Sequence, residues 1–180
     1  MGVAFLKVTL VVYGVATGLY LAYVATFRAV LADWARRALH VAFLVHVVAL
    51  PEWMGALGPQ RLTTIYGVLP IAAWMLVAGY LIVDWRFGVR VLGAFVTPII
   101  CLALLVGLIA DPSTAVVGRE VRGALLPVHI SLAFLGAAAL ALAAGGAVLY
   151  LLLERQVKQK RFGRIFHRFP SLETLDRIND

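Results

Sequence analysis

Residues 125–153 read LLPVHISLAFLGAAALALAAGGAVLYLLL, and this stretch decides the fold because it contains no Asp, Glu, Lys or Arg. A bilayer core about 30 Å thick is spanned by roughly 20 apolar residues in a helix. The stretch is therefore predicted to be a membrane-spanning helix.

The rest of the chain has the same character. Of its 180 residues, 63% are hydrophobic and 14% are charged, whereas soluble domains are roughly 45–50% apolar and about 25% charged. This composition excludes an ordinary soluble domain. Four more apolar runs precede residues 125–153, and they cover residues 8–27, 38–54, 64–83 and 91–110. We predict a single all-α integral membrane domain over residues 1–180, with five spans and a basic tail over residues 154–180.

The second run is the shortest of the five. Its most apolar part, residues 38–50, ends before Pro51, and a run of this length is also typical of a re-entrant or interfacial segment. Pro70 and Pro98 lie inside the third and fourth runs, where membrane helices tolerate proline as a kink.

The net charge of +7 is a topology signal. With five spans, four basic residues lie on the side of the N-terminus and twelve on the opposite side, seven of them in the tail. Because positive charge concentrates in the cytoplasm, we expect the N-terminus outside and the tail inside. Without the second span, the split would be ten to six. Membrane lipids are the expected partners of this charge, and nucleic acid is not.

Aromatic and small residues indicate anchoring and packing. Trp34, Trp53 and Trp85 lie near predicted span ends, where indole rings anchor helices at the membrane interface. The pair Gly14 and Gly18 favours close helix contacts. Glycine and alanine residues along the fifth run favour them too.

Two histidines are the main candidates for chemistry. His129 lies about one turn into the fifth run, above a face of small residues. An ionisable residue inside a span is a functional candidate, and a helix N-terminus disfavours the imidazolium, which leaves the ring able to bind a metal. His46 is predicted near the same outer boundary. Two such imidazoles can provide both axial ligands of a haem iron, and Arg119 and Arg122 on that side can pair with the propionates. The alternatives are hydrogen bonds between helices and solvated arginines.

The sequence gives less reason to assign a function to the remaining candidates. His40 precedes His46 by six positions, roughly 240° around a helix, so the two cannot share a face. We expect His40 to be a polar interface residue and His167, in the tail, to be solvated. Cys101 is the single cysteine, which excludes thiol–disulfide chemistry within the chain.

Three segments resemble the cytochrome c assembly protein family, in particular its short HemX- and YpjD-like branch related to CcsA and ResC. They are LPVHISL at residues 126–132, LYLLLERQVK at 149–158 and FPSLETLD at 169–176. The pattern from Arg36 and Arg37 to His46 resembles the HemX branch as well. The resemblance implies that His129 is a haem ligand on the outer side of the membrane.

Family members of this kind continue for about three more spans. We expect this chain to be a natural half-length protein, a truncated reading frame or one part of a split protein. A missing C-terminal half or other maturation proteins are then its expected partners, with apocytochrome c as a further one.

The resemblance and the residues together predict a haem-handling protein of the bacterial-type inner membrane. It would hold haem near the outer leaflet through His129 and His46, with Arg119 and Arg122 on the propionates, and it would be an assembly factor rather than a self-contained enzyme. One alternative is a HemX-like regulator of tetrapyrrole synthesis whose basic tail makes the contact. Another is a structural subunit without its own cofactor.

Overall fold

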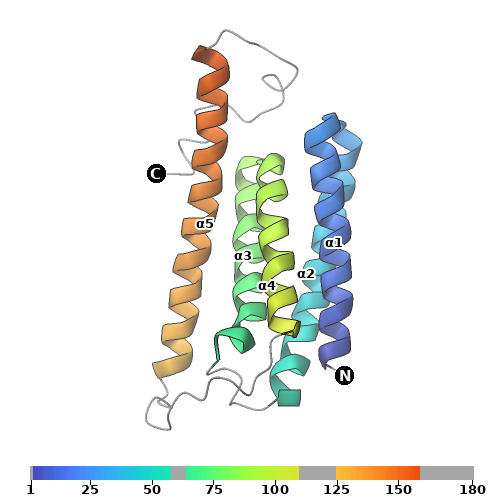
Figure 1. Ribbon diagram of the computed structural model, residues 1–180, viewed down its shortest axis with the longest axis vertical. Helices are drawn as coiled ribbons and strands as arrows, with labels where there is room; N and C mark the ends of the chain where they lie inside the picture. Colours follow the sequence, from blue (N-terminus) through green and yellow to red (C-terminus); the bar gives the residue numbers. More distant parts are fainter. Residues whose placement is uncertain (1, 58–63, 110–124, 159–180) are drawn as a thin grey trace.

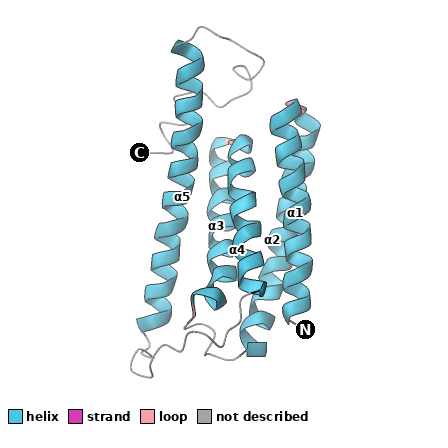
Figure 2. Ribbon diagram, viewed as in Figure 1, coloured by secondary structure: helices cyan, strands magenta, loops and turns pink. Residues whose placement is uncertain are grey.

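The computed structural model describes residues 2–57, 64–109 and 125–158, and all regular structure in these ranges is helical (Figure 1 and Figure 2). The helices are α1 Gly2–Thr26, α2 Ala29–Leu57, α3 Ile65–Phe87, α4 Gly93–Ile109 and α5 Leu125–Lys158, with a short 3₁₀ turn, η2 Arg90–Leu92, before α4. Five helices are long and apolar enough to cross a membrane. The prediction of an all-α, multi-pass membrane protein is confirmed. The orientation of the termini stays a prediction.

Helix α2 corrects the predicted second span. It begins at Ala29 rather than at residue 38 and continues through Pro51, so its length suits a full crossing rather than a re-entrant segment. The charged residues in its first turns do not end the helix. Asp33 pairs with Arg90 of η2 at 2.8 Å, and Arg36 pairs with Asp84 of α3 at 3.1 Å.

Helices α1 and α2 form an antiparallel hairpin with a regular seam. The two-residue connection includes Phe27 in a left-handed conformation with φ 54°. Buried positions alternate in steps of three and four, which is the spacing of a coiled-coil seam. In α1 they are Leu6, Thr9, Tyr13, Ala16, Tyr20 and Tyr23. In α2 they are Ala32, Ala35, Leu39, Ala42, His46, Ala49 and Trp53.

Helices α3 and α4 approach each other closely, and glycine makes this possible. A Cβ built on Gly107 would lie 3.2 Å from Pro70 Cδ. A Cβ on Gly93, at the start of α4, would lie 2.6 Å from the Tyr20 ring and from the Tyr80 hydroxyl. Both predicted prolines, Pro70 and Pro98, lie inside helices that continue past them.

The ends of α3 carry local signals that explain its bounds. The Thr64 side chain accepts a hydrogen bond from the Gly67 N–H at 3.1 Å, which caps the N-terminus. Gly88 adopts φ 68° after the last turn, and its N–H donates to the Asp84 carbonyl at 2.8 Å.

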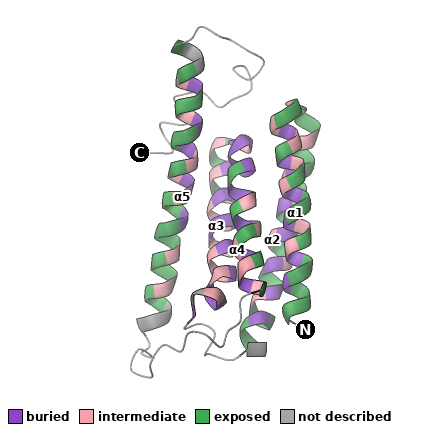
Figure 3. Ribbon diagram, viewed as in Figure 1, coloured by how far each residue is buried: buried purple, intermediate pink, exposed green. Residues whose placement is uncertain are grey.

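Helix α5 lies at the edge of the bundle and packs on α3 (Figure 1). Its buried residues begin only at Ala138, and they are Ala138, Leu142, Gly146, Leu149 and Leu153. Over residues 128–137 not one residue is buried (Figure 3). The first part of α5 is therefore open to whatever surrounds the chain.

Two packing predictions are wrong for the described residues. A Cβ on Gly14 or Gly18 would meet nothing within 4 Å, so this glycine pair does not pack inside the chain. Trp53 is 2% exposed rather than at an interface. Its indole N–H donates to the Gly67 carbonyl at 3.4 Å, which fixes α2 to α3.

Candidate functional site

His129 lies in the open part of α5. Its side chain is exposed, and no residue in the described ranges makes a hydrogen bond or an ion pair with it. Both ring nitrogens are thus without a partner among the residues that the structure describes. A neutral imidazole with a free nitrogen can ligate a transition metal.

The side of α5 that carries His129 includes two small residues and one leucine. Ala133, Gly136 and Leu140 follow at positions i+4, i+7 and i+11 and are exposed. A Cβ on Gly136 would meet nothing within 4 Å. The helical repeat places these residues on the side of α5 opposite to Leu142 and Leu149, which pack against the bundle. His129 therefore faces away from the other four helices.

His46 has the opposite environment. It is 0% exposed in the α1–α2 seam, and its Nδ1 lies 3.3 Å from the Tyr13 hydroxyl, with the two rings edge to face. Its Nε2 is buried without a hydrogen-bond partner. The Tyr13 contact orients the ring in the way that a supporting residue orients a metal-bound histidine. The same contact agrees with the alternative in which His46 makes a hydrogen bond between helices and binds no metal.

The structure does not bring His46 and His129 to a common face. His46 is enclosed between α1 and α2, whereas His129 lies on the outward side of α5, which packs on α3. Arg119, Arg122 and His167 lie outside the described residues. Their predicted roles as propionate partners and as a solvated tail residue stay predictions.

His40 is exposed near the middle of α2, six residues before His46. Its Nδ1 lies 2.7 Å from the carbonyl oxygen of Arg36, one turn earlier on the same helix. It has no contact with His46, in agreement with the helical spacing. His40 therefore provides a control position for the other two histidines.

A cluster of polar residues between α1, α2, α3 and η2 was not predicted. The Tyr80 hydroxyl donates to the Tyr20 hydroxyl at 3.2 Å, and Asp84 accepts from Arg36 Nε through one oxygen. The other oxygen, Oδ1, is buried without a hydrogen-bond partner. The only sequence signal for Tyr20 was its place in the three-and-four spacing of α1. Most of the neighbouring positions in α1 are also apolar. A difference in polarity therefore does not mark which face of the helix is buried.

Cys101 is half-buried on α4 and close to α1. Its Sγ lies 3.4 Å from the Thr17 hydroxyl. In the described ranges no group of three His, Cys, Asp or Glu side chains is placed to hold a metal ion.

The end of α5 carries an ion pair outside the apolar span. Lys158 donates to Glu154 at 2.6 Å, and this hydrogen bond together with the carboxylate charge raises the pKa of Lys158. The pair is exposed and lies at the far end of the helix from His129.

Comparison with known proteins gives the family. The family model described as cytochrome C assembly protein matches residues 62–180. The chain belongs to this family. No curated protein and no solved structure matches the chain. The resemblance found in the sequence is thus confirmed for the family, and the protein has a role in c-type cytochrome biogenesis.

The matched range separates the two histidines. It contains α3, α4 and α5 with His129, together with Asp84 and Tyr80. The α1–α2 hairpin with His46 and Tyr13 precedes it. The part of the chain that matches the family model therefore includes the exposed His129, whereas the buried His46 lies outside it.

Proposed function

We propose that this protein binds haem as cargo through His129 during c-type cytochrome biogenesis, near the outer leaflet of an inner membrane. The observation that carries the proposal is the exposed imidazole of His129, which has no partner among the described residues and lies on a helix long and apolar enough to cross a membrane. A polar side chain facing lipid is unfavourable. Coordination to iron removes that cost and gives the ring a function.

The described residues would hold haem through a single ligand. His129 provides the ligand nitrogen, and the exposed Ala133 and Gly136 leave room beside it for a flat macrocycle. The apolar residues of the same helix suit the porphyrin faces. Bound haem supplies the iron porphyrin that the pathway attaches to an apocytochrome. His129 would bind and orient it, and Arg119 and Arg122 are the proposed partners of its propionates.

The second axial ligand is less well supported by the geometry. His46 was proposed for it, but its ring is enclosed in the α1–α2 seam and hydrogen-bonded to Tyr13. Haem iron would reach Nε2 only if the hairpin opened. A ligand from another maturation protein requires no such opening, since His129 faces outward. We therefore propose His129 as the primary ligand.

The haem content of protein made under haem-replete conditions tests this proposal. Wild type and the variants His129→Ala and His40→Ala are purified in the same detergent, and haem per chain is measured as the pyridine haemochrome. We expect a loss of at least about tenfold in the haem content of His129→Ala. His40→Ala is the matched control because it removes an exposed histidine from α2, and it should retain haem. Equal haem content in all three proteins would contradict the proposal.

A structural subunit without its own cofactor is the second candidate. The same open face of α5 favours it, because small exposed residues such as Gly136 let another membrane helix approach closely. This alternative predicts a folded, colourless wild type that takes up no added haem. His129 would then make a hydrogen bond to the neighbouring helix.

A further inference from the structure

The basic residues at one end of the bundle fall into two groups. Arg36 and Arg90 form ion pairs with Asp84 and Asp33. Three other arginines at this end, Arg28, Arg37 and Arg86, are exposed and have no carboxylate partner among the described residues. The first group links helices, and the second leaves an excess of positive charge on the surface.

Aromatic side chains accompany this unpaired charge. The Arg37 guanidinium lies 5.2 Å from the centre of the Trp34 ring, and that of Arg86 lies 5.7 Å from the centre of the Phe87 ring. Trp34 is 55% exposed, and Trp85, beside Arg86, is 77% exposed. Exposed indole rings next to arginine are typical of the level where a membrane protein meets lipid headgroups.

The ion pairs place these residues at a common level. The Arg36–Asp84 pair joins α2 to α3, so Arg37 and Trp85 flank it on the two helices. The Asp33–Arg90 pair joins α2 to η2, and Trp34 follows Asp33 directly on α2. All of these residues lie at the end of the bundle where α1, α3 and α5 finish and where α2 and α4 begin (Figure 1). We call Arg28, Trp34, Arg37, Trp85 and Arg86 the basic–aromatic rim.

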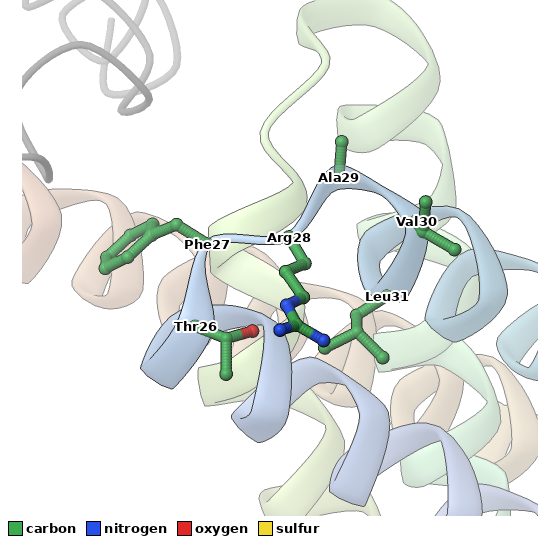
Figure 4. Close-up of a pocket in the computed structure, with 6 residues that line it drawn as sticks. All are labelled: Thr26, Phe27, Arg28, Ala29, Val30 and Leu31. Carbon is green, nitrogen blue, oxygen red and sulfur yellow. The ribbon is translucent and has the colours of Figure 1, made fainter.

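A hollow lies at the turn between α1 and α2, within the rim. It has a volume of about 540 Å³ and is lined by residues 26–31. Arg28 extends between Thr26 and Leu31 there (Figure 4). The lining is largely apolar apart from Arg28 and the Thr26 hydroxyl, so it combines a cationic group with carbon-rich walls.

We propose that the basic–aromatic rim binds the phosphate groups of anionic phospholipids. Its charge has no carboxylate partner in the described part of the chain, and the opposite charge is present at a membrane surface. The exposed indoles match the depth of the headgroups. This proposal is independent of haem binding.

Lipid retention tests the proposal on the full chain. The protein is equilibrated in detergent micelles that contain phosphatidylcholine and phosphatidylglycerol, and bound lipid is counted by native mass spectrometry. We expect wild type to retain phosphatidylglycerol preferentially. Each of Arg28→Gln, Arg37→Gln and Arg86→Gln should weaken the preference by roughly fivefold. Lys7→Gln is the matched control, because it removes an exposed charge from the opposite end of the bundle and should leave the preference unchanged.

Two results would overturn the proposal. One is an equal preference for phosphatidylglycerol in wild type and in all three arginine variants. The other is displacement of the bound lipid by soluble glycerol phosphate at the affinity of the lipid itself, which would identify a free phosphate ester as the ligand. The single variants remove no ion pair, so we expect their unfolding temperatures to match wild type and to keep the comparison valid.

Discussion

The α1–α2 hairpin and the first part of α5 have similar apolar composition, and they are used in opposite ways. In the hairpin, every third or fourth residue is buried in a seam that includes Tyr13 and His46. Over residues 128–137 of α5, no residue is buried. The difference teaches that hydrophobicity places a helix in the membrane but does not determine its partner. His46 in the seam contacts a residue of the neighbouring helix, whereas His129 is exposed and has no partner among the described residues.

The largest effect is expected from a pair of glycine substitutions, one in each kind of region. Gly93→Ala places a Cβ 2.6 Å from the Tyr20 ring and should lower the free energy of unfolding by roughly 1–3 kcal/mol. Gly136→Ala meets open space and should be neutral or raise it by up to about 1 kcal/mol. Thermal unfolding in one detergent compares the two. Equal losses of unfolding free energy in the two variants would show that α5 is packed at Gly136, and the two regions would then not differ.

Two aspartates, one buried and one exposed, extend the comparison to the ion pairs of the bundle. Asp84 has a side chain that is 2% exposed, and its partner Arg36 is 35% exposed. Asp84→Asn should destabilise the protein by on the order of 1–3 kcal/mol, less than a fully buried pair because Arg36 reaches solvent. Asp33→Asn removes an exposed partner and should cost less than about 1 kcal/mol. Chemical denaturation of both variants measures the difference, and the reverse order would contradict the assignment of Asp84 to the core.

A smaller effect is expected in the seam itself. Tyr13→Phe removes the hydroxyl that contacts His46 Nδ1, and hydrogen bonds between membrane helices contribute about 0.6 kcal/mol on average. A double-mutant cycle with His46→Leu should give a coupling of this size. Haem content should not change in Tyr13→Phe. A shifted haem spectrum in that variant would instead support His46 as an iron ligand.

Composition and run length predicted the five spans well, because both depend only on local sequence. The start of α2 was misplaced because Asp33, Arg36 and Arg37 resemble a loop when considered alone. Two of them find opposite charges on η2 and α3, which are distant in sequence. Trp53 was misassigned for a similar reason, since its acceptor is the carbonyl of Gly67 on the next helix.

The sequence selected candidate residues, but it did not give their surroundings. The sequence singled out His129 and His46 because ionisable residues are rare inside apolar runs. It did not predict that one would be enclosed and the other exposed, since that depends on which face of each helix meets a neighbour. The three-and-four spacing from Leu6 to Tyr23 contained this information for α1. Most of the other positions in α1 are apolar as well, so the buried face cannot be distinguished from the exposed face by polarity.

Titration of the haem-free, detergent-purified protein with hemin tests the central claim most directly. The Soret band is followed in wild type, in His129→Ala and in His46→Ala. We predict a saturable spectral change in wild type, an affinity lower by at least about tenfold in His129→Ala, and little change in His46→Ala. Wild-type affinity in His129→Ala, or the absence of saturable binding in folded wild type, would contradict the assignment of haem binding to the open face of α5.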